Sequence, residues 1–288
     1  MAEAALPAAA FLAVKFDSIV TLIHVIEKSP PDEVHGQPHL KNTEEATAYL
    51  KDVARRAFPS GARIDFHVHT AETDNVAESI VAHAGELDHD IILMCSHGRG
   101  KAFHLLFGSI AQKVISGGRL PVLIIRPGKN DLQKFSCDSL LLPLDGDAEH
   151  AEALPVSKEL AKAFGAIIHL AVVIPGFGDL SGQRAVTSRF LPGTTSKILE
   201  VSAQKAEEYI QSQLAVLRDQ GFKADAHVLQ GDPAAVIDNV ALEFNAGLIV
   251  MTTHGKSGMD AFWSGSVTHK ISIRSMIPLL LIPIKDRL

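Results

Sequence analysis

The chain carries the same short motif twice. His97-Gly98 is followed, after nine intervening residues, by Gly108-Ser109, and His254-Gly255 is followed at the same spacing by Gly265-Ser266. Each copy stands between two apolar runs, the second opened by a proline, and the offset is 157 residues throughout. The runs are 91–94 and 121–125 in the first copy, and 248–251 and 278–282 in the second. Because an internal repeat defines architecture before any single residue is interpreted, the sequence predicts two related domains.

Length and composition fit two globular domains. The 288 residues suffice for two cores, and 47% hydrophobic with 21% charged residues is typical of a soluble protein. A formal net charge of −6, with scattered Lys and Arg, argues against a nucleic-acid partner. Cys95 and Cys137 form no disulfide framework or zinc spacing. No apolar stretch reaches the ~18–20 residues of a membrane span, so we expect no membrane partner and a cytoplasmic location.

The second copy alternates strand and helix patterns. A buried strand ends in an acid at Asp145, and helical spacing then continues to Gly165. Strands are expected at 166–174 and 224–229, and helices at 197–220 and 234–245, with a polar insert from Pro175 to about Ser196. Strands this apolar are buried on both faces, as in a parallel sheet that helices cover on each side.

The first copy matches the second from its first helix onward. Leu6-Pro7 corresponds to Leu154-Pro155, and residues 19–26 correspond to 167–174 with an offset of 148. The counterpart of the strand Leu140–Asp145 would precede Met1, so the Ala-rich start is expected to be helical rather than a signal peptide. With a linker at 127–131, the domains are predicted to span 1–127, lacking its first strand, and 137–285.

Three phrases carry a family resemblance: Leu-Ile-His-Val-Ile at 22–26, Ser-His-Gly-Arg-Gly at 96–100, and Gly-Ser followed by Pro-Val-Leu-Ile-Ile at 108–125. With the doubled motif, the chain resembles a tandem member of the universal stress protein family. The resemblance implies an α/β fold of two parallel-sheet sandwich domains, adenine-nucleotide hydrolase-like, with strand order 3-2-1-4-5. It also implies pairing through the last strands, here Val122–Ile125 with Leu279–Ile282 as an intramolecular pseudo-dimer, and leaves a homodimer open.

The glycine motif has the chemistry of a phosphate site. Glycines after a parallel strand let backbone N–H groups approach phosphate oxygens, and a helix that starts at Gly-Ser offers more donors to the same anion. Some members of the family bind ATP through Gly-x-x-Gly, nine residues, Gly-Ser/Thr. Carried over, the resemblance implies ATP, with Mg²⁺, in the second domain at Pro143, Asp145, Val173, Met251, Thr252, His254, Gly255, Gly265, Ser266, Val267 and Thr268.

The two copies differ around this motif. Thr252 stands where the pattern has its first glycine, and its Cβ narrows the backbone approach, depending on the local φ. In the first domain Cys95 takes that place and the acid of strand one is missing. Nucleotide is therefore expected only in the second domain.

Other readings of the same residues remain open. Asp145 could instead cap the following helix, and Cys95 is more simply an inert thiol. His67 and His69 face the same side of a strand, but no third ligand follows from spacing, so no metal site is assigned. The sequence has no Gly-x-Ser-x-Gly elbow and no Walker motif, so at most slow ATP hydrolysis is expected. The alternative function is a stress-response interaction scaffold that binds no nucleotide, and a nucleotidyl-transfer enzyme is a distant third.

Overall fold

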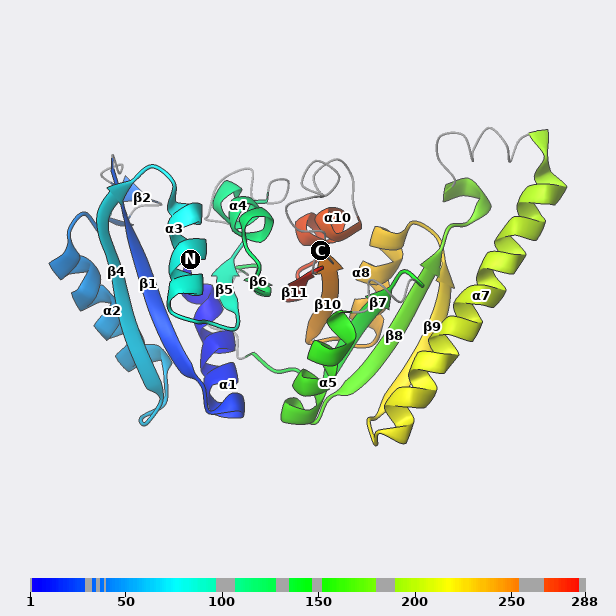
Figure 1. Cartoon of the computed structure of the whole chain (residues 1–288), viewed down its shortest axis with the longest axis horizontal. Coiled ribbons are helices and arrows are strands. Elements are labelled where there is room, and N and C mark those ends of the chain that lie inside the picture. Colours follow the sequence, from blue (N-terminus) through cyan, green and yellow to red (C-terminus); the bar gives the residue numbers. More distant parts are fainter. Residues whose placement is uncertain are drawn as a thin grey trace. The chain divides into compact units, whose positions relative to one another are not determined.

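The structure is a computed structural model of the chain, shown in Figure 1. It describes residues 2–28, 33–34, 37–38, 40–96, 107–127, 135–146, 152–179, 190–253 and 267–284. The chain divides into two compact units, unit 1 mainly from residues 1–136 and unit 2 mainly from residues 137–284. Within the described residues, no helix combines the length and apolar character needed to cross a bilayer.

Unit 2 contains five parallel strands. They are β7 (Ser139–Leu144), β8 (Ile167–Ile174), β9 (Ala224–Gln230), β10 (Leu248–Thr253) and β11 (Leu279–Pro283). Their order is β9-β8-β7-β10-β11, which confirms the predicted order 3-2-1-4-5. The first strand of the unit is therefore the central one. Leu140, Leu141 and Leu142 are each 0% exposed. Because consecutive strand residues point to opposite faces, both faces of β7 are covered.

The helices of unit 2 are α5 (Ala153–Phe164), α7 (Pro192–Asp219), α8 (Pro233–Glu243) and α10 (Val267–Arg274), with a short 3-10 turn, η3 (Phe177–Asp179). Helix α5 packs on β7, α7 packs on β8 and β9, and α8 contacts β8, β9 and α10 (Figure 1). Each connection between neighbouring strands is thus a helical crossover, as parallel pairing requires.

Helix α7 begins earlier than the sequence pattern predicted. It starts at Pro192 rather than at Lys197, inside the segment interpreted as a polar insert. Proline suits a first helical turn because its missing N–H has no intrahelical acceptor there. The Thr195 hydroxyl donates to the Leu191 carbonyl at 3.0 Å, so a Thr-rich stretch is held as helix. Residues 180–189 of the insert lie outside the described residues.

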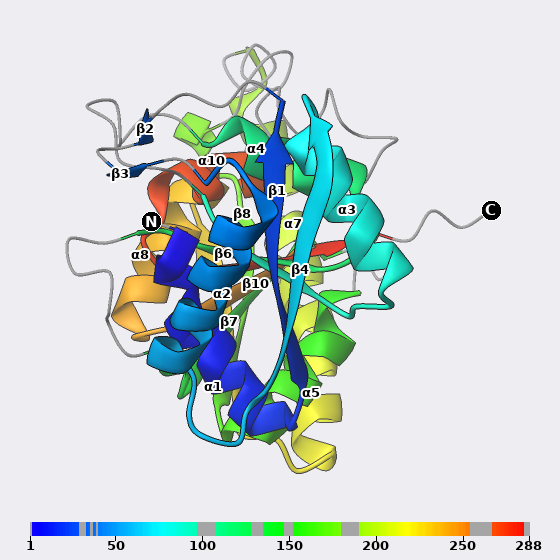
Figure 2. The same ribbon diagram turned by 90° about the vertical axis from the view of Figure 1, so that its left-hand side faces the viewer.

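Unit 1 has helices η1 (Ala2–Ala5), α1 (Leu6–Phe16), α2 (Thr43–Ala57), α3 (Val76–Glu86) and α4 (Ser109–Gly117). Strand β1 (Ile19–Glu27) pairs in parallel with β4 (Arg63–Thr73), and β5 (Ile92–Cys95) pairs in parallel with β6 (Val122–Ile125). Two-residue strands β2 (Glu33–Val34) and β3 (Gln37–Pro38) form a small antiparallel pair. Figure 2 shows α2 and α3 on opposite sides of the β1–β4 pair.

The described part of unit 1 contains no strand between β1 and β5. Matched to the repeat, its four long strands correspond to the second, third, fourth and fifth strands of unit 2, and the described residues of unit 1 contain no counterpart of β7. The Ala-rich start is helical, as expected.

We expect β7 to dominate the stability of unit 2. Replacing Leu141 with Ala removes a fully buried side chain and should lower the free energy of unfolding by about 2–5 kcal/mol. The readout is hydrogen exchange of β8 and β10 amides under denaturant. Leu242→Ala is the matched control, because this side chain is 61% exposed, and its exchange profile should stay close to wild type.

Candidate functional site

The carboxyl ends of β7, β8 and β10 meet at one edge of the unit 2 sheet. Strand β8 continues from β7 to one side, whereas β10 lies on the other side of β7. The strands are all parallel, but the side of the sheet to which the chain adds successive strands therefore changes at β7. Crevices that bind ligands in open α/β sheets lie at this switch point, outside the carboxyl ends of the strands.

The end of β7 presents an acid at this edge. Pro143 is half-buried and pairs in register with Ala171, and Asp145 follows the strand with an exposed side chain. Gly146 has φ +86°, a conformation that turns the chain away sharply and favours glycine. The described start of α5 has Glu152 as its N-cap, and residues 147–151, which join Asp145 to this helix, lie outside the described residues.

Val173 lies near the end of β8, half-buried and in register with Leu229 of β9. The next turn depends on Gly231. Its φ is +140°, its N–H donates to the Ile174 carbonyl at 3.0 Å, and a Cβ there would lie 2.9 Å from Val236. Glycine thus allows α8 to start directly beside the ends of β8 and β9.

The end of β10 is joined to the start of α10. Met251 is buried, and the Thr268 hydroxyl donates to the Thr252 carbonyl at 3.4 Å, so the first turn of α10 lies against the strand end. Val267 is the first residue of that helix. The Thr253 hydroxyl is buried and has no hydrogen-bond partner within the described residues. One buried polar group at this edge is therefore available to a ligand.

Thr252 fits its place without backbone strain. The non-glycine residues with positive φ in the described chain are Asp17, Asp88 and Asn245, and neither Thr252 nor Cys95 is among them. Losing the first glycine of the motif therefore adds a Cβ but demands no left-handed backbone. Of the remaining predicted site residues, His254, Gly255, Gly265 and Ser266 lie outside the described residues.

Asp232 is a residue of this edge that the sequence analysis left as part of a turn. Its Oδ1 accepts from the Ala235 N–H at 3.0 Å, which caps α8, and its Oδ2 lies 3.6 Å from Lys270 Nζ of α10. The Ala235 N–H and the Lys270 ammonium hold the pKa of Asp232 below its usual value. An Asp immediately before Pro233 at a helix start is the sequence signal for such a cap.

In unit 1 the matching edge differs. Met94 and Cys95 end β5 as half-buried side chains, and the Cys95 thiol donates to the Ala2 carbonyl at 3.5 Å. Gly108 starts α4, and its N–H donates to the Ser96 carbonyl at 2.8 Å. No strand or strand-end acid is present beside it in the described residues, so this edge lacks one wall.

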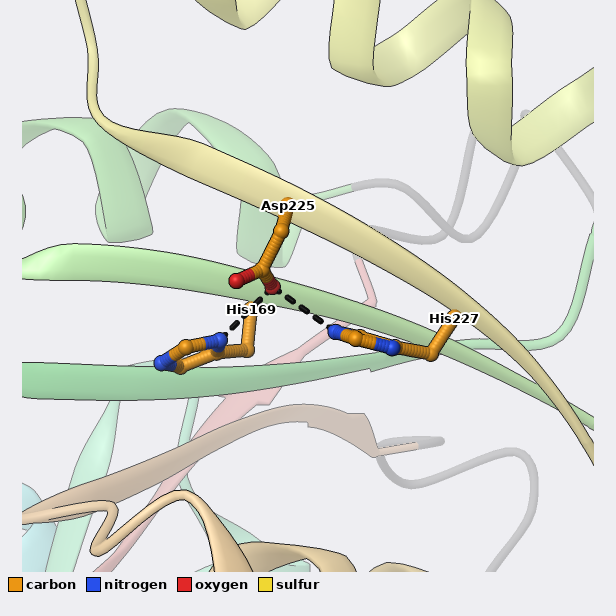
Figure 3. A group of neighbouring side chains, drawn as sticks. All are labelled: His169, Asp225 and His227. Atoms are coloured by element: carbon orange, nitrogen blue, oxygen red, sulfur yellow. Dashed lines mark hydrogen bonds and ion pairs between the residues drawn. The ribbon is translucent and has the colours of Figure 1, made fainter.

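A second polar cluster lies on β8 and β9, away from their carboxyl ends. Figure 3 shows His169 and His227 on either side of Asp225. Hydrogen bonds join Asp225 Oδ1 to His169 Nδ1 (2.6 Å) and to His227 Nε2 (2.9 Å). Both imidazole rings also lie 4.6 Å from the Phe244 ring. Sequence spacing alone could not find this group, because His169 joins it only through the pairing of β8 with β9.

The histidine pair singled out in unit 1 also gains a partner from another element. His83 of α3 places Nε2 2.7 Å from His69 Nδ1, and its ring centroid is 4.3 Å from that of His67. Burial and the neighbouring His83 and His69 lower the pKa of His67.

Two tandem α/β units, which share four strands in the same order along the chain and carry the same glycine motif in the sequence, define the class of protein. The model of the universal stress protein family matches residues 1–126 and 137–283. The chain therefore belongs to the universal stress protein family, which confirms the resemblance read from the sequence.

Individual relatives agree with this assignment. The chain is 28% identical to universal stress protein MJ0531 of Methanocaldococcus jannaschii over 159 residues, 55% of this chain and 86% of that protein. It is 32% identical to universal stress protein YxiE of Bacillus subtilis over 158 residues, 50% of this chain and 98% of that protein. A universal stress protein structure from Archaeoglobus fulgidus shares the fold at 19% identity, with a TM-score of 0.68 over 98% of this chain and 94% of that chain.

The Asp232 cap gives unit 2 a specific pH response. Because its pKa is lowered in the folded state, its stabilisation is present above the ordinary Asp value of 3.8 and is lost as pH falls through the lower, folded value. Asp232→Ala should destabilise α8 by about 0.5–2 kcal/mol at neutral pH. Asp232→Asn keeps an accepting oxygen but should flatten the acid limb, measured by urea unfolding from pH 7 to pH 3. Equal acid limbs in wild type and Asp232→Asn would contradict this.

Proposed function

We propose that unit 2 binds an adenine nucleotide, ATP with Mg²⁺, at the carboxyl edge of its sheet. The protein would act in the cytoplasm as a stress-response regulator. The observation that carries this is the switch point at β7, where an acid follows the central strand and the start of α10 lies against the end of β10. An acid and a helix start on either side of such a crevice suit the sugar or metal and the phosphates of a nucleotide.

The described residues fit this ligand. Pro143 and Val173 offer half-buried apolar surface for the base, and Asp145 offers carboxylate oxygens to a ribose hydroxyl or to Mg²⁺, which prefers oxygen ligands. Thr252 adds no backbone strain, and the buried Thr253 hydroxyl lies at the same strand end as Met251. We assign the phosphates to His254, Gly255, Gly265, Ser266, Val267 and Thr268.

Binding rather than catalysis is the expected role. At this edge the described residues contain no nucleophile paired with a general base, and Asp145 is the acid that follows the central strand. The nucleotide would act by favouring one conformation of the residues around it, with slow hydrolysis at most.

Equilibrium dialysis with labelled ATP and Mg²⁺ tests the proposal. Wild type should retain ATP, Asp145→Ala should bind about tenfold more weakly for a lost charge-assisted contact, and Gly265→Val should abolish retention. Asp138→Ala is the matched control, because Asp138 is exposed at the opposite end of β7. The site would be overturned if wild type retained no ATP. It would also be overturned if Asp145→Ala and Gly265→Val retained as much ATP as wild type.

One observation favours the alternative of an interaction scaffold. Unit 1 keeps the glycine motif but has no strand between β1 and β5 in its described part. If dialysis shows no ATP binding, a scaffold role becomes the leading function, and isolation of partners under stress conditions is then the next experiment.

A further inference from the structure

The polar cluster of β8 and β9 consists of three side chains that commonly bind metal ions. His169 comes from β8, and Asp225 and His227 come from β9 (Figure 3). His169 and Asp225 are paired in register, and His227 follows Asp225 by two residues, so all three side chains lie on one face of the sheet. Imidazole nitrogens and carboxylate oxygens are ligands of divalent transition metals. The cluster therefore has the donor set of a metal site.

The sheet fixes the backbone that carries these side chains. Residues 168–174 of β8 pair without interruption with residues 224–230 of β9, and β8 is also paired with β7 on its other side. The backbones of paired strands cannot separate without breaking the hydrogen bonds of the ladder. The distances between the donor atoms can therefore change mainly through side-chain torsions.

Three separations describe the donor atoms. Asp225 Oδ1 lies 2.6 Å from His169 Nδ1 and 2.9 Å from His227 Nε2. The third separation, between the nitrogens of the two histidines, reaches 4.8 Å. The carboxylate oxygen thus lies between the two rings, and the long separation decides which metal geometry the cluster fits.

A tetrahedral ion requires the larger rearrangement. At a metal–ligand distance of about 2.1 Å, each pair of tetrahedral ligands lies about 3.4 Å apart. The two imidazole nitrogens would have to approach each other by about 1.4 Å, while the carboxylate oxygen moved away from both. Zn²⁺ in its usual tetrahedral geometry is therefore a poor match for the long separation.

A square-planar or tetragonal ion fits all three separations more closely. At the same metal–ligand distance, adjacent ligands lie about 3.0 Å apart and opposite ligands about 4.2 Å apart. With the imidazoles opposite each other and the carboxylate adjacent to both, the nitrogens approach by about 0.6 Å, and the two oxygen–nitrogen separations lengthen by about 0.4 and 0.1 Å. Small rotations within the existing rotamers can supply these changes.

The surroundings favour a cation and leave room for it. The side chains of Asp225 and His227 are 41% and 32% exposed, so water can reach the remaining positions of an ion, whereas that of His169 is 11% exposed. The Phe244 ring lies 4.6 Å from both imidazoles, and Phe244 is the C-cap of α8. The carboxyl end of this helix, with its partial negative charge, therefore lies beside the cluster. The last turn of α8 has no basic residue to offset that charge.

The repeat provides an internal comparison. Asp65 and His67 of β4 have the same Asp-x-His spacing as the pair on β9. Thr21 of β1 is paired in register with Asp65, at the place that His169 takes in unit 2. The Asp-x-His pair thus occurs in both units, whereas the imidazole from the neighbouring strand occurs at this position in unit 2.

We propose that His169, Asp225 and His227 bind a divalent metal ion of tetragonal geometry, Ni²⁺ or Cu²⁺. The two imidazoles lie on opposite sides of the ion, the carboxylate lies between them, and water completes the coordination. The ion replaces the protons of the hydrogen bonds that join Asp225 to both rings, and these protons are released to water. The site lies away from the carboxyl edge of the sheet and does not depend on nucleotide binding there.

Calorimetric titration of the full chain with NiCl2 tests the site. The wild-type isotherm should contain one site that Asp225→Asn and His227→Ala each weaken at least about tenfold. His83→Ala is the matched control, because it removes a histidine that contacts His69 in unit 1 and should leave this affinity unchanged. Urea unfolding of each variant without metal checks the fold, and Asp225→Asn, which keeps the size of its side chain, remains a test if His227→Ala is unfolded.

Unchanged Ni²⁺ affinity in Asp225→Asn, or a site lost only in His83→Ala, would overturn the assignment. A parallel titration with ZnCl2 tests the geometry, and Zn²⁺ should bind at least about tenfold more weakly than Ni²⁺. Equal or tighter binding of Zn²⁺ would overturn the tetragonal arrangement.

Electron paramagnetic resonance of the complex with one equivalent of Cu²⁺ counts the bound imidazoles. Wild type should give an axial spectrum with nitrogen couplings from two imidazoles, and His227→Ala should keep the couplings of one. A single imidazole in wild type would contradict the proposal, because it would mean that the two rings do not close on the same ion.

Discussion

The structure depends on the central strand of a parallel sheet. In unit 2, β7 pairs with β8 on one side and with β10 on the other, and it is buried on both faces. The other strands of the unit extend outward from it in both directions. Parallel strands with both faces covered gain apolar burial on all sides. The strand sequence Ser-Leu-Leu-Leu-Pro-Leu has the composition that this place requires. Its position also sets where the chain reverses direction across the sheet.

The same constraint explains how the two units differ. In unit 2 the end of β7 brings Asp145 to the edge where β10 meets α10, and a candidate nucleotide site results. In unit 1 the matching place is a cavity, and the side chains of residues 20–24 of β1 are half-buried where those of residues 168–172 of β8 are buried. Two copies of one glycine motif therefore have different surroundings. The glycine motif determines the conformation of the loop after the fourth strand, whereas the central strand forms one side of the crevice in which a ligand would bind.

Some features were predictable because they depend on local periodicity. The parallel character of the sheet, the lack of a β7 counterpart in the described part of the first repeat and the helical Ala-rich start follow from apolar runs and the repeat offset, whereas the strand order was implied by the family resemblance. The early start of α7 at Pro192 was missed, because Thr and Gly weaken the helical pattern in a stretch that is helical in the structure and in which the Thr195 hydroxyl donates to the Leu191 carbonyl. The role of Asp232 was missed because Lys270 reaches it from a separate helix.

The sequence by itself determined the family, through whose resemblance the order of strands followed, and the residues at the ends of each strand. Only the tertiary structure decided which of these residues lie together. His169 and Asp225 are 56 positions apart and meet through strand register, and in the described part of unit 1 a cavity lies between β1 and β5 where unit 2 has β7. Local sequence encodes burial and direction along an element, whereas contacts between elements depend on pairing and packing across the whole fold.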